Sequence, residues 1–98
     1  MIVIDGCQYA NWSEKIFREM NDGGVNAVHV TICYHEDFRE TVENMADWNR
    51  YFERFPELVV PGRTAGDVRN AHETGRTAII FGFQNCSPIE DDIGLVEI

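Results

Sequence analysis

The sequence predicts an α/β fold of parallel strands and helices. Short runs rich in Val and Ile alternate with longer stretches that carry apolar residues every three or four positions. Three such strand–helix units form either an open doubly wound sheet or part of a barrel, and a complete (β/α)8 barrel takes about 250 residues. We expect residues 1–98 to be a single partial domain, the amino-terminal portion of a TIM-type (β/α)8 barrel. A free-standing three-stranded unit is the alternative.

The predicted strands span about residues 2–5, 26–33 and 77–83. The first is "IVID", the second is "NAVHVTIC", rich in β-branched residues, and the third is "TAIIFGF". Helical connections between them indicate right-handed crossovers, so the strands should be parallel neighbours in that order. We expect the helices to cover one face of this sheet.

Capping signals place the helices between the strands. Ser13 is a plausible cap for a first helix that Gly23-Gly24 ends, and Asp37 opens the longest helix, which Pro56 stops. Thr64 and Asp67 resemble a capping box for a third helix that closes at Gly75. Ser87, with Pro88 at the first helical position, predicts a last helix that carries Ile89, Ile93 and Val96 on one face.

Composition excludes several classes of function. The 17 acids against 8 Lys and Arg give a net charge of −9, which would repel a phosphate backbone, so nucleic acid is not an expected partner. No stretch reaches the roughly 18 apolar residues of a membrane span, and the start lacks a signal-peptide pattern. Three cysteines are an odd number, which favours reduced thiols. We expect a cytoplasmic protein that does not bind membranes.

Three strings carry a family resemblance: "DGCQYANW", "LVVPGRTAGDVRNAHETGRTAIIFGFQN" and "SPIEDDIGLVEI". In order and spacing they resemble the amino-terminal third of the renal or membrane dipeptidase family, whose members are metal-dependent, amidohydrolase-like barrel hydrolases. The resemblance implies a metallopeptidase with a two-zinc site that cleaves dipeptides, and therefore a role in proteolysis. It also implies that the family's later metal ligands and catalytic acid or base lie beyond residue 98, so no catalytic residue is assigned in this stretch.

The sequence departs from the family where the resemblance places metal ligands. Cys7 and Tyr9 stand where the family's first strand ends in His-x-Asp, and Gln84 stands where a Glu bridges the two metals. A neutral amide offers one carbonyl oxygen and no charge, and a phenol is a weak ligand at neutral pH. Cys7 is the credible ligand, because a thiolate binds zinc. We expect one divalent metal, zinc, or none.

Alternation along the strands predicts a pocket. Val28, Val30 and Ile32 suit contact with helices, which leaves the residues between them for the opposite face. In a barrel that face is the lumen, and active sites lie at the carboxyl ends of the strands. The residues expected to face this pocket, together with Cys7 and Gln84, are Asp5, His29, Thr31, Cys33 and Asn85.

Each candidate also has a purely structural interpretation. Asp5 is either a base or an acceptor of backbone N–H groups, and the three cysteines are either soft metal ligands or small buried hydrophobes. His29 fits a hydrogen-bonded lumen residue better than a ligand. The segments 34–37 and 90–92 are better explained as a loop with a helix cap and as acids in a first helical turn.

Two functions follow from these observations. The first is the amino-terminal segment of a dipeptidase-like metallohydrolase that cleaves dipeptides or related small amides at an altered metal site. The second is a metal-free, inactive barrel that serves as a binding or partner subunit. In both cases exposed sheet edges should recruit the remainder of the barrel or a second chain, as a homo- or hetero-oligomer.

Overall fold

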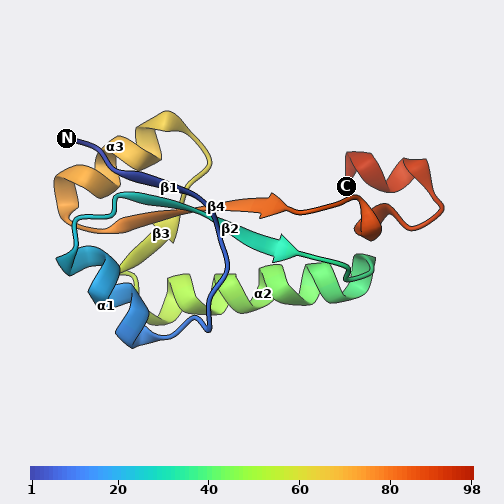
Figure 1. Ribbon diagram of the computed structural model, residues 1–98, viewed down its shortest axis with the longest axis horizontal. Helices are drawn as coiled ribbons and strands as arrows, with labels where there is room; N and C mark the ends of the chain where they lie inside the picture. Colours follow the sequence, from blue (N-terminus) through green and yellow to red (C-terminus); the bar gives the residue numbers. More distant parts are fainter.

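The computed structural model describes residues 1–98 and contains one four-stranded parallel sheet (Figure 1). The strands β1 (Ile4–Gln8), β2 (Ala27–Cys33), β3 (Val59–Pro61) and β4 (Thr77–Phe83) lie in the order β1-β2-β4-β3. The three predicted strands are therefore parallel neighbours in the predicted order, as part of a TIM-type barrel requires. The prediction omitted the short edge strand β3, which pairs with the amino end of β4.

The first strand begins and ends later than predicted. It runs through Asp5 and Gly6 to Gln8, and its pairing with β2 is irregular between Asp5 and Gln8. Asp5, the last residue of the predicted strand, and Gly6 after it therefore mark the start of an irregular stretch inside the strand.

The three main helices begin and end at the predicted signals: α1 (Glu14–Asp22), α2 (Phe38–Arg54) and α3 (Ala65–Thr74). Ser13 Oγ accepts from the backbone of Ile16, and Asp37 and Thr64 each form a complete capping box. Gly75 ends α3 in the left-handed conformation, with φ of 70°. None of the helices is both long enough and apolar enough to cross a bilayer.

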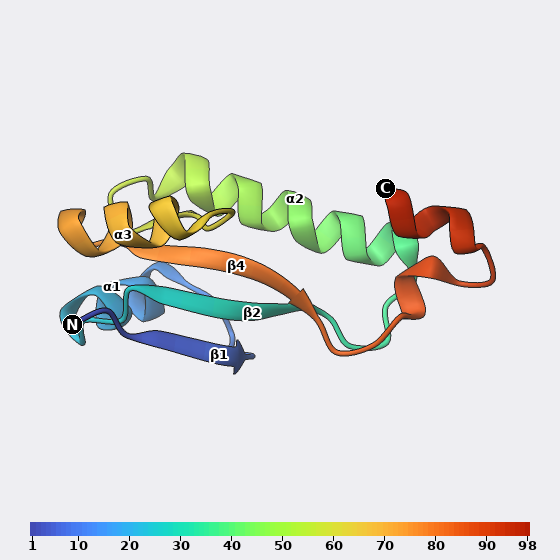
Figure 2. The ribbon, with the colours of Figure 1, turned by 90° about the horizontal axis from the view of Figure 1, so that it is seen from above.

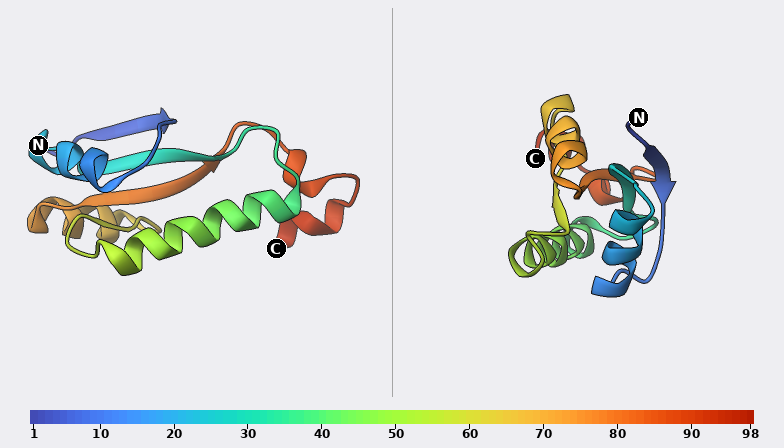
Figure 3. Two further views of the ribbon diagram at one scale, coloured as in Figure 1. Left: turned by 90° about the horizontal axis from the view of Figure 1, so that it is seen from below. Right: turned by 90° about the vertical axis from the view of Figure 1, so that its left-hand side faces the viewer.

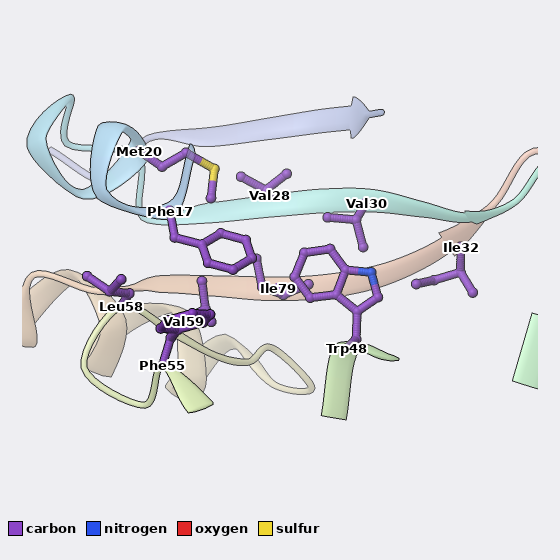
Figure 4. Close-up of a cluster of buried hydrophobic side chains, with 10 residues drawn as sticks. All are labelled: Phe17, Met20, Val28, Val30, Ile32, Trp48, Phe55, Leu58, Val59 and Ile79. Atoms are coloured by element: carbon purple, nitrogen blue, oxygen red, sulfur yellow. The ribbon is translucent and has the colours of Figure 1, made fainter. Parts of the chain in front are cut away.

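The main core lies between the sheet and the helices α1 and α2 (Figure 4). Val28, Val30 and Ile32 point from β2 into this core, as the alternation predicted, and they meet Phe17 of α1 and Trp48 of α2. Both aromatic side chains are almost fully buried. The contact fixes which face of the sheet is left for the candidate site.

The prediction that all helices cover one face is wrong. The helix α3 lies on the opposite side of the sheet from α1 and α2 (Figures 1 and 3). Val68 and Ala71 of α3 pack against Ala27 and Ala78, which alternate with the residues of the main core. Because these strand residues are alanines, a helix can approach the sheet closely there.

The last segment also differs from the prediction. Instead of one helix it forms two short 3₁₀ helices, η1 (Ser87–Ile89) and η2 (Ile93–Glu97), at the end of the molecule far from the amino terminus (Figure 2). Cys86, not Ser87, precedes η1, and no side chain caps it. Glu90 has φ of 51°, which breaks the helix because a left-handed residue cannot continue it. Ser87 is engaged elsewhere, donating from Oγ to the carbonyl of Glu36.

Candidate functional site

The candidate site is built around Cys7 on β1. Asp5 pairs with Val28 and Gln8 with Val30, so two residues of β1 lie opposite the single residue His29 of β2. This is the count of a β-bulge, a feature that re-aims side chains at the ends of strands. Cys7 adopts φ of 64°, a left-handed conformation that is uncommon outside glycine. Its thiol is exposed and free.

Gln84 connects the ends of three strands. Its Nε2 donates to Cys7 Sγ at 2.7 Å and to Thr31 Oγ1 at 3.2 Å. Its backbone N donates to the carbonyl of Cys33 at 2.9 Å. Residues far apart in the sequence therefore meet at the carboxyl edge of β1, β2 and β4, where parallel α/β folds place their ligands.

Next to this cluster, His29 occupies the space that Gly82 leaves. A Cβ added at Gly82 would lie 1.9 Å from His29 Nε2, so the imidazole ring lies directly over the backbone of β4. Gly82 pairs with Thr31 of β2, and His29 comes two residues before Thr31 on the same strand. The ring therefore lies next to the Gln84 cluster, on the side of the amino ends of the strands. The only sign of this contact in the sequence is the glycine at position 82. Its meaning becomes clear only when the pairing of β2 with β4 is known.

Replacing Gly82 with alanine is expected to lower the free energy of unfolding by about 1–3 kcal/mol, because the His29 ring or the strand must move. Adding His29→Ala to Gly82→Ala should recover much of this loss, because it removes the clashing ring. Urea denaturation measures both. Gly66→Ala is the control, because its Cβ would meet only Thr64 Oγ1, at 3.5 Å. If Gly82→Ala lowered the free energy of unfolding equally in the presence and in the absence of the His29 ring, the described contact would be contradicted.

The other predicted site residues fall in different places. Cys33 is fully buried, and its Sγ lies 3.2 Å from Ser87 Oγ, under the loop after β2. At the shift in strand pairing between Thr31 and Cys33, the side chain of Cys33 turns away from the cluster, and only its backbone carbonyl bonds to Gln84. Asn85 ties two loops together, donating to the carbonyl of Tyr34 and accepting from the backbone of Ser87. Asp5 is exposed on β1.

Tyr9 and Glu36, which follow the ends of β1 and β2, do not contact Gln84. The ring of Tyr9 packs edge-on against Tyr34, with centroids 5.5 Å apart, and Tyr9 is 69% exposed. Glu36 accepts backbone N–H groups from Tyr34 and His35, and these bonds hold the pKa of its carboxyl below the usual value. Its contribution to stability is therefore present above the ordinary pKa and lost as the pH falls through the lowered one.

The side chains that meet at Gln84 do not fit the ligand set of a two-zinc site. They are a thiol, a hydroxyl and an amide, and the amide presents its N–H to the thiol, whereas a metal ligand must present a lone pair. No three His, Cys, Asp or Glu side chains in residues 1–98 lie close enough together to hold a metal ion. Of the three side chains in the cluster, only Cys7 can supply a negative charge.

Comparison with known proteins finds similarity among solved structures. No protein-family model matches the chain, and no curated protein matches it. Among solved structures, the chain is similar to an amidohydrolase from Pseudomonas aeruginosa, with 42% sequence identity and a TM-score of 0.93. The chain has an amidohydrolase-like fold. The match covers 98% of this chain and 30% of that protein, so the chain spans about a third of its length.

The coarse part of the sequence interpretation is therefore confirmed: an amidohydrolase-like, hydrolase-type α/β segment. The finer assignment to the renal or membrane dipeptidase family stays a prediction, as do zinc and the dipeptide substrate.

Proposed function

We propose that residues 1–98 form the first part of a hydrolase barrel that cleaves dipeptides or related small amides, with a metal site altered to hold one zinc ion or none. The observation that supports it most is the similarity to the Pseudomonas aeruginosa amidohydrolase over 98% of the chain. At 42% identity the likeness extends beyond the fold to the sequence. The meeting of Cys7, Thr31 and Gln84 at the carboxyl edge of the sheet agrees with an active site at that end.

In this proposal the segment's own residues shape the substrate site. The Gln84 amide and the Thr31 hydroxyl are hydrogen-bonding groups at the strand ends, and His29 fills the space below them. When a zinc ion is bound, it would polarise the amide carbonyl and activate water. Cys7 is the only residue of this segment that we nominate as its ligand, and further ligands would come from the rest of the barrel.

Completion of the barrel is part of the proposal. Four of the five residues of β1 are exposed, and β3 pairs only with the first half of β4. An apolar groove of ≈ 520 Å³ runs between α2, the end of β4 and the last two 3₁₀ helices. We propose that the remainder of the barrel, in the same or a second chain, covers these surfaces. Unpaired edges and exposed apolar grooves otherwise promote association.

The deciding experiment combines metal analysis with an activity assay. The full-length protein, purified without chelators, is expected to contain at most one zinc per chain by elemental mass spectrometry. It is expected to hydrolyse some members of a dipeptide panel. Stripping the metal with a chelator and restoring zinc should remove and restore the activity. Two fully occupied metals bridged by the Gln84 side chain would contradict the altered site.

A metal-free binding or partner subunit is the second candidate. The direct bond between Gln84 Nε2 and Cys7 Sγ favours it, because the two side chains satisfy each other without a metal. No metal and no hydrolysis of any dipeptide in the full-length protein would select this function over the first.

A further inference from the structure

A second hollow, separate from the apolar groove, opens on the α2 side of the sheet. It has a volume of ≈ 220 Å³ and lies between the loop after β1, the end of β2 and the middle of α2. Five aromatic side chains line it: Tyr9, Trp12, Tyr34, Trp48 and Tyr51. We call it the aromatic hollow.

The rings that line the aromatic hollow meet one another edge-on and not as a flat stack. Trp12 meets Trp48 at a centroid distance of 5.2 Å and an interplanar angle of 62°, and Trp48 meets Tyr51 at 5.3 Å and 74°. Tyr9 and Tyr34 are nearly perpendicular, at 88°. Tyr51 is held in place by its hydroxyl, which donates to the carbonyl of Trp12 at 3.3 Å. Rings in such arrangements turn faces in several directions, and each face carries negative potential.

The charged residues that line the aromatic hollow are both acids. Glu36 and Asp47 line it, and no Lys, Arg or His does. The backbone N–H groups that hold the pKa of Glu36 below its usual value keep this carboxyl ionised at neutral pH. Asp47 pairs with Arg50 at 2.5 Å, but both groups are exposed, so the pair is weak, and a second carboxylate oxygen stays available.

We propose that the aromatic hollow binds a small organic ammonium ion. Aromatic faces together with carboxylates attract a cation that is itself weakly hydrated, and quaternary and primary ammonium groups have this chemistry. The volume is below the roughly 300–1,000 Å³ of a pocket for drug-sized ligands, so the ligand is a single headgroup with little attached. The net charge of −9 adds attraction from a distance.

The inference goes beyond the proposed function and does not depend on hydrolysis. The two sites share one residue, because Thr31 lines the aromatic hollow and its Oγ1 also accepts from the Gln84 amide.

Ligand-observed NMR with choline chloride tests the proposal on the full-length protein. The N-methyl resonance should shift upfield through the ring currents of the surrounding aromatic residues and saturate with a Kd of about 1–10 mM. Trp12 and Trp48 are the two tryptophans of residues 1–98, and both line the aromatic hollow, so their fluorescence should change over the same range. Ethylammonium in place of choline tells whether a primary amine is also accepted, and binding of either ion supports the proposal.

Variants and a neutral analogue decide where and why the ion binds. Tyr9→Leu and Asp47→Asn should each weaken choline binding about three- to ten-fold, because they remove an aromatic wall or a charge. Tyr9 is 69% exposed, so folding should not depend on it. Asp91→Asn, an exposed acid outside the hollow, should leave the Kd unchanged. Equal binding of the neutral analogue 3,3-dimethylbutan-1-ol, no saturable binding of either cation, or indifference to both hollow variants would overturn the proposal.

Discussion

Replacing Phe17 with alanine is expected to lower the free energy of unfolding by about 3–5 kcal/mol, the range for a buried aromatic residue whose cavity cannot close. Phe17 is completely buried between α1 and the sheet. Its ring lies 5.2 Å from that of Tyr51 and 5.8 Å from that of Trp48, so its loss would remove contacts with α2 as well. Chemical denaturation followed by circular dichroism measures the change.

Glu19→Ala on the same helix is the matched control. Glu19 is exposed and pairs only with Lys15 at 3.7 Å, so its replacement should change stability by no more than about 0.5 kcal/mol. If Phe17→Ala cost as little as this control, α1 would not pack on the sheet as described.

Local chemistry made much of this fold predictable. The caps at Ser13, Asp37 and Thr64 each satisfy backbone donors within a few residues, so their effect depends little on the rest of the molecule. The alternation of Val28, Val30 and Ile32 was equally informative, because one face of β2 had to meet the helices.

Features set by distant contacts were not predictable in the same way. Ser87 and Pro88 satisfy the rules for a helix start, yet Ser87 Oγ bonds to the carbonyl of Glu36, 51 residues away, and the helix does not form. The position of α3 depended on which face of the sheet had room. The small residues Ala27 and Ala78 make room for α3, but the alternation along the strands does not by itself show that a helix packs on them.

The candidate site likewise has features that the sequence predicted and features that depend on distant contacts. The family resemblance selected Cys7 and Gln84, and the structure places Gln84 Nε2 2.7 Å from Cys7 Sγ. The bulge at Cys7, which aims its thiol, and the close fit of His29 over Gly82 required the register of the strands. Cys33 shares the alternation of Thr31 but is turned away where the pairing shifts. Alternation is therefore reliable only as far as the regular ladder extends.

Replacing Gln84 with glutamate is expected to raise the metal content of the full-length protein by up to one zinc per chain. The substitution adds a negative charge and a second anionic oxygen at the point where three strands end, which are the two properties a bridging ligand needs. Cys7→Ser should have the opposite effect, because it removes the one thiolate of the cluster. Elemental analysis of both variants after growth with zinc measures the change.

A second readout separates this local effect from a general change in charge. In metal-free buffer, a carboxylate at position 84 would face Cys7 Sγ, and like-charge repulsion should disfavour the thiolate. Alkylation of Cys7 by iodoacetamide should therefore slow in Gln84→Glu, because the thiolate is the reactive form. Asn70→Asp adds the same charge on the exposed surface of α3 and should change neither zinc content nor alkylation rate. If Gln84→Glu left both the zinc content and the alkylation rate unchanged, the residue at position 84 would not control the charge at this site. The proposal that Gln84 alters the metal site would then be contradicted.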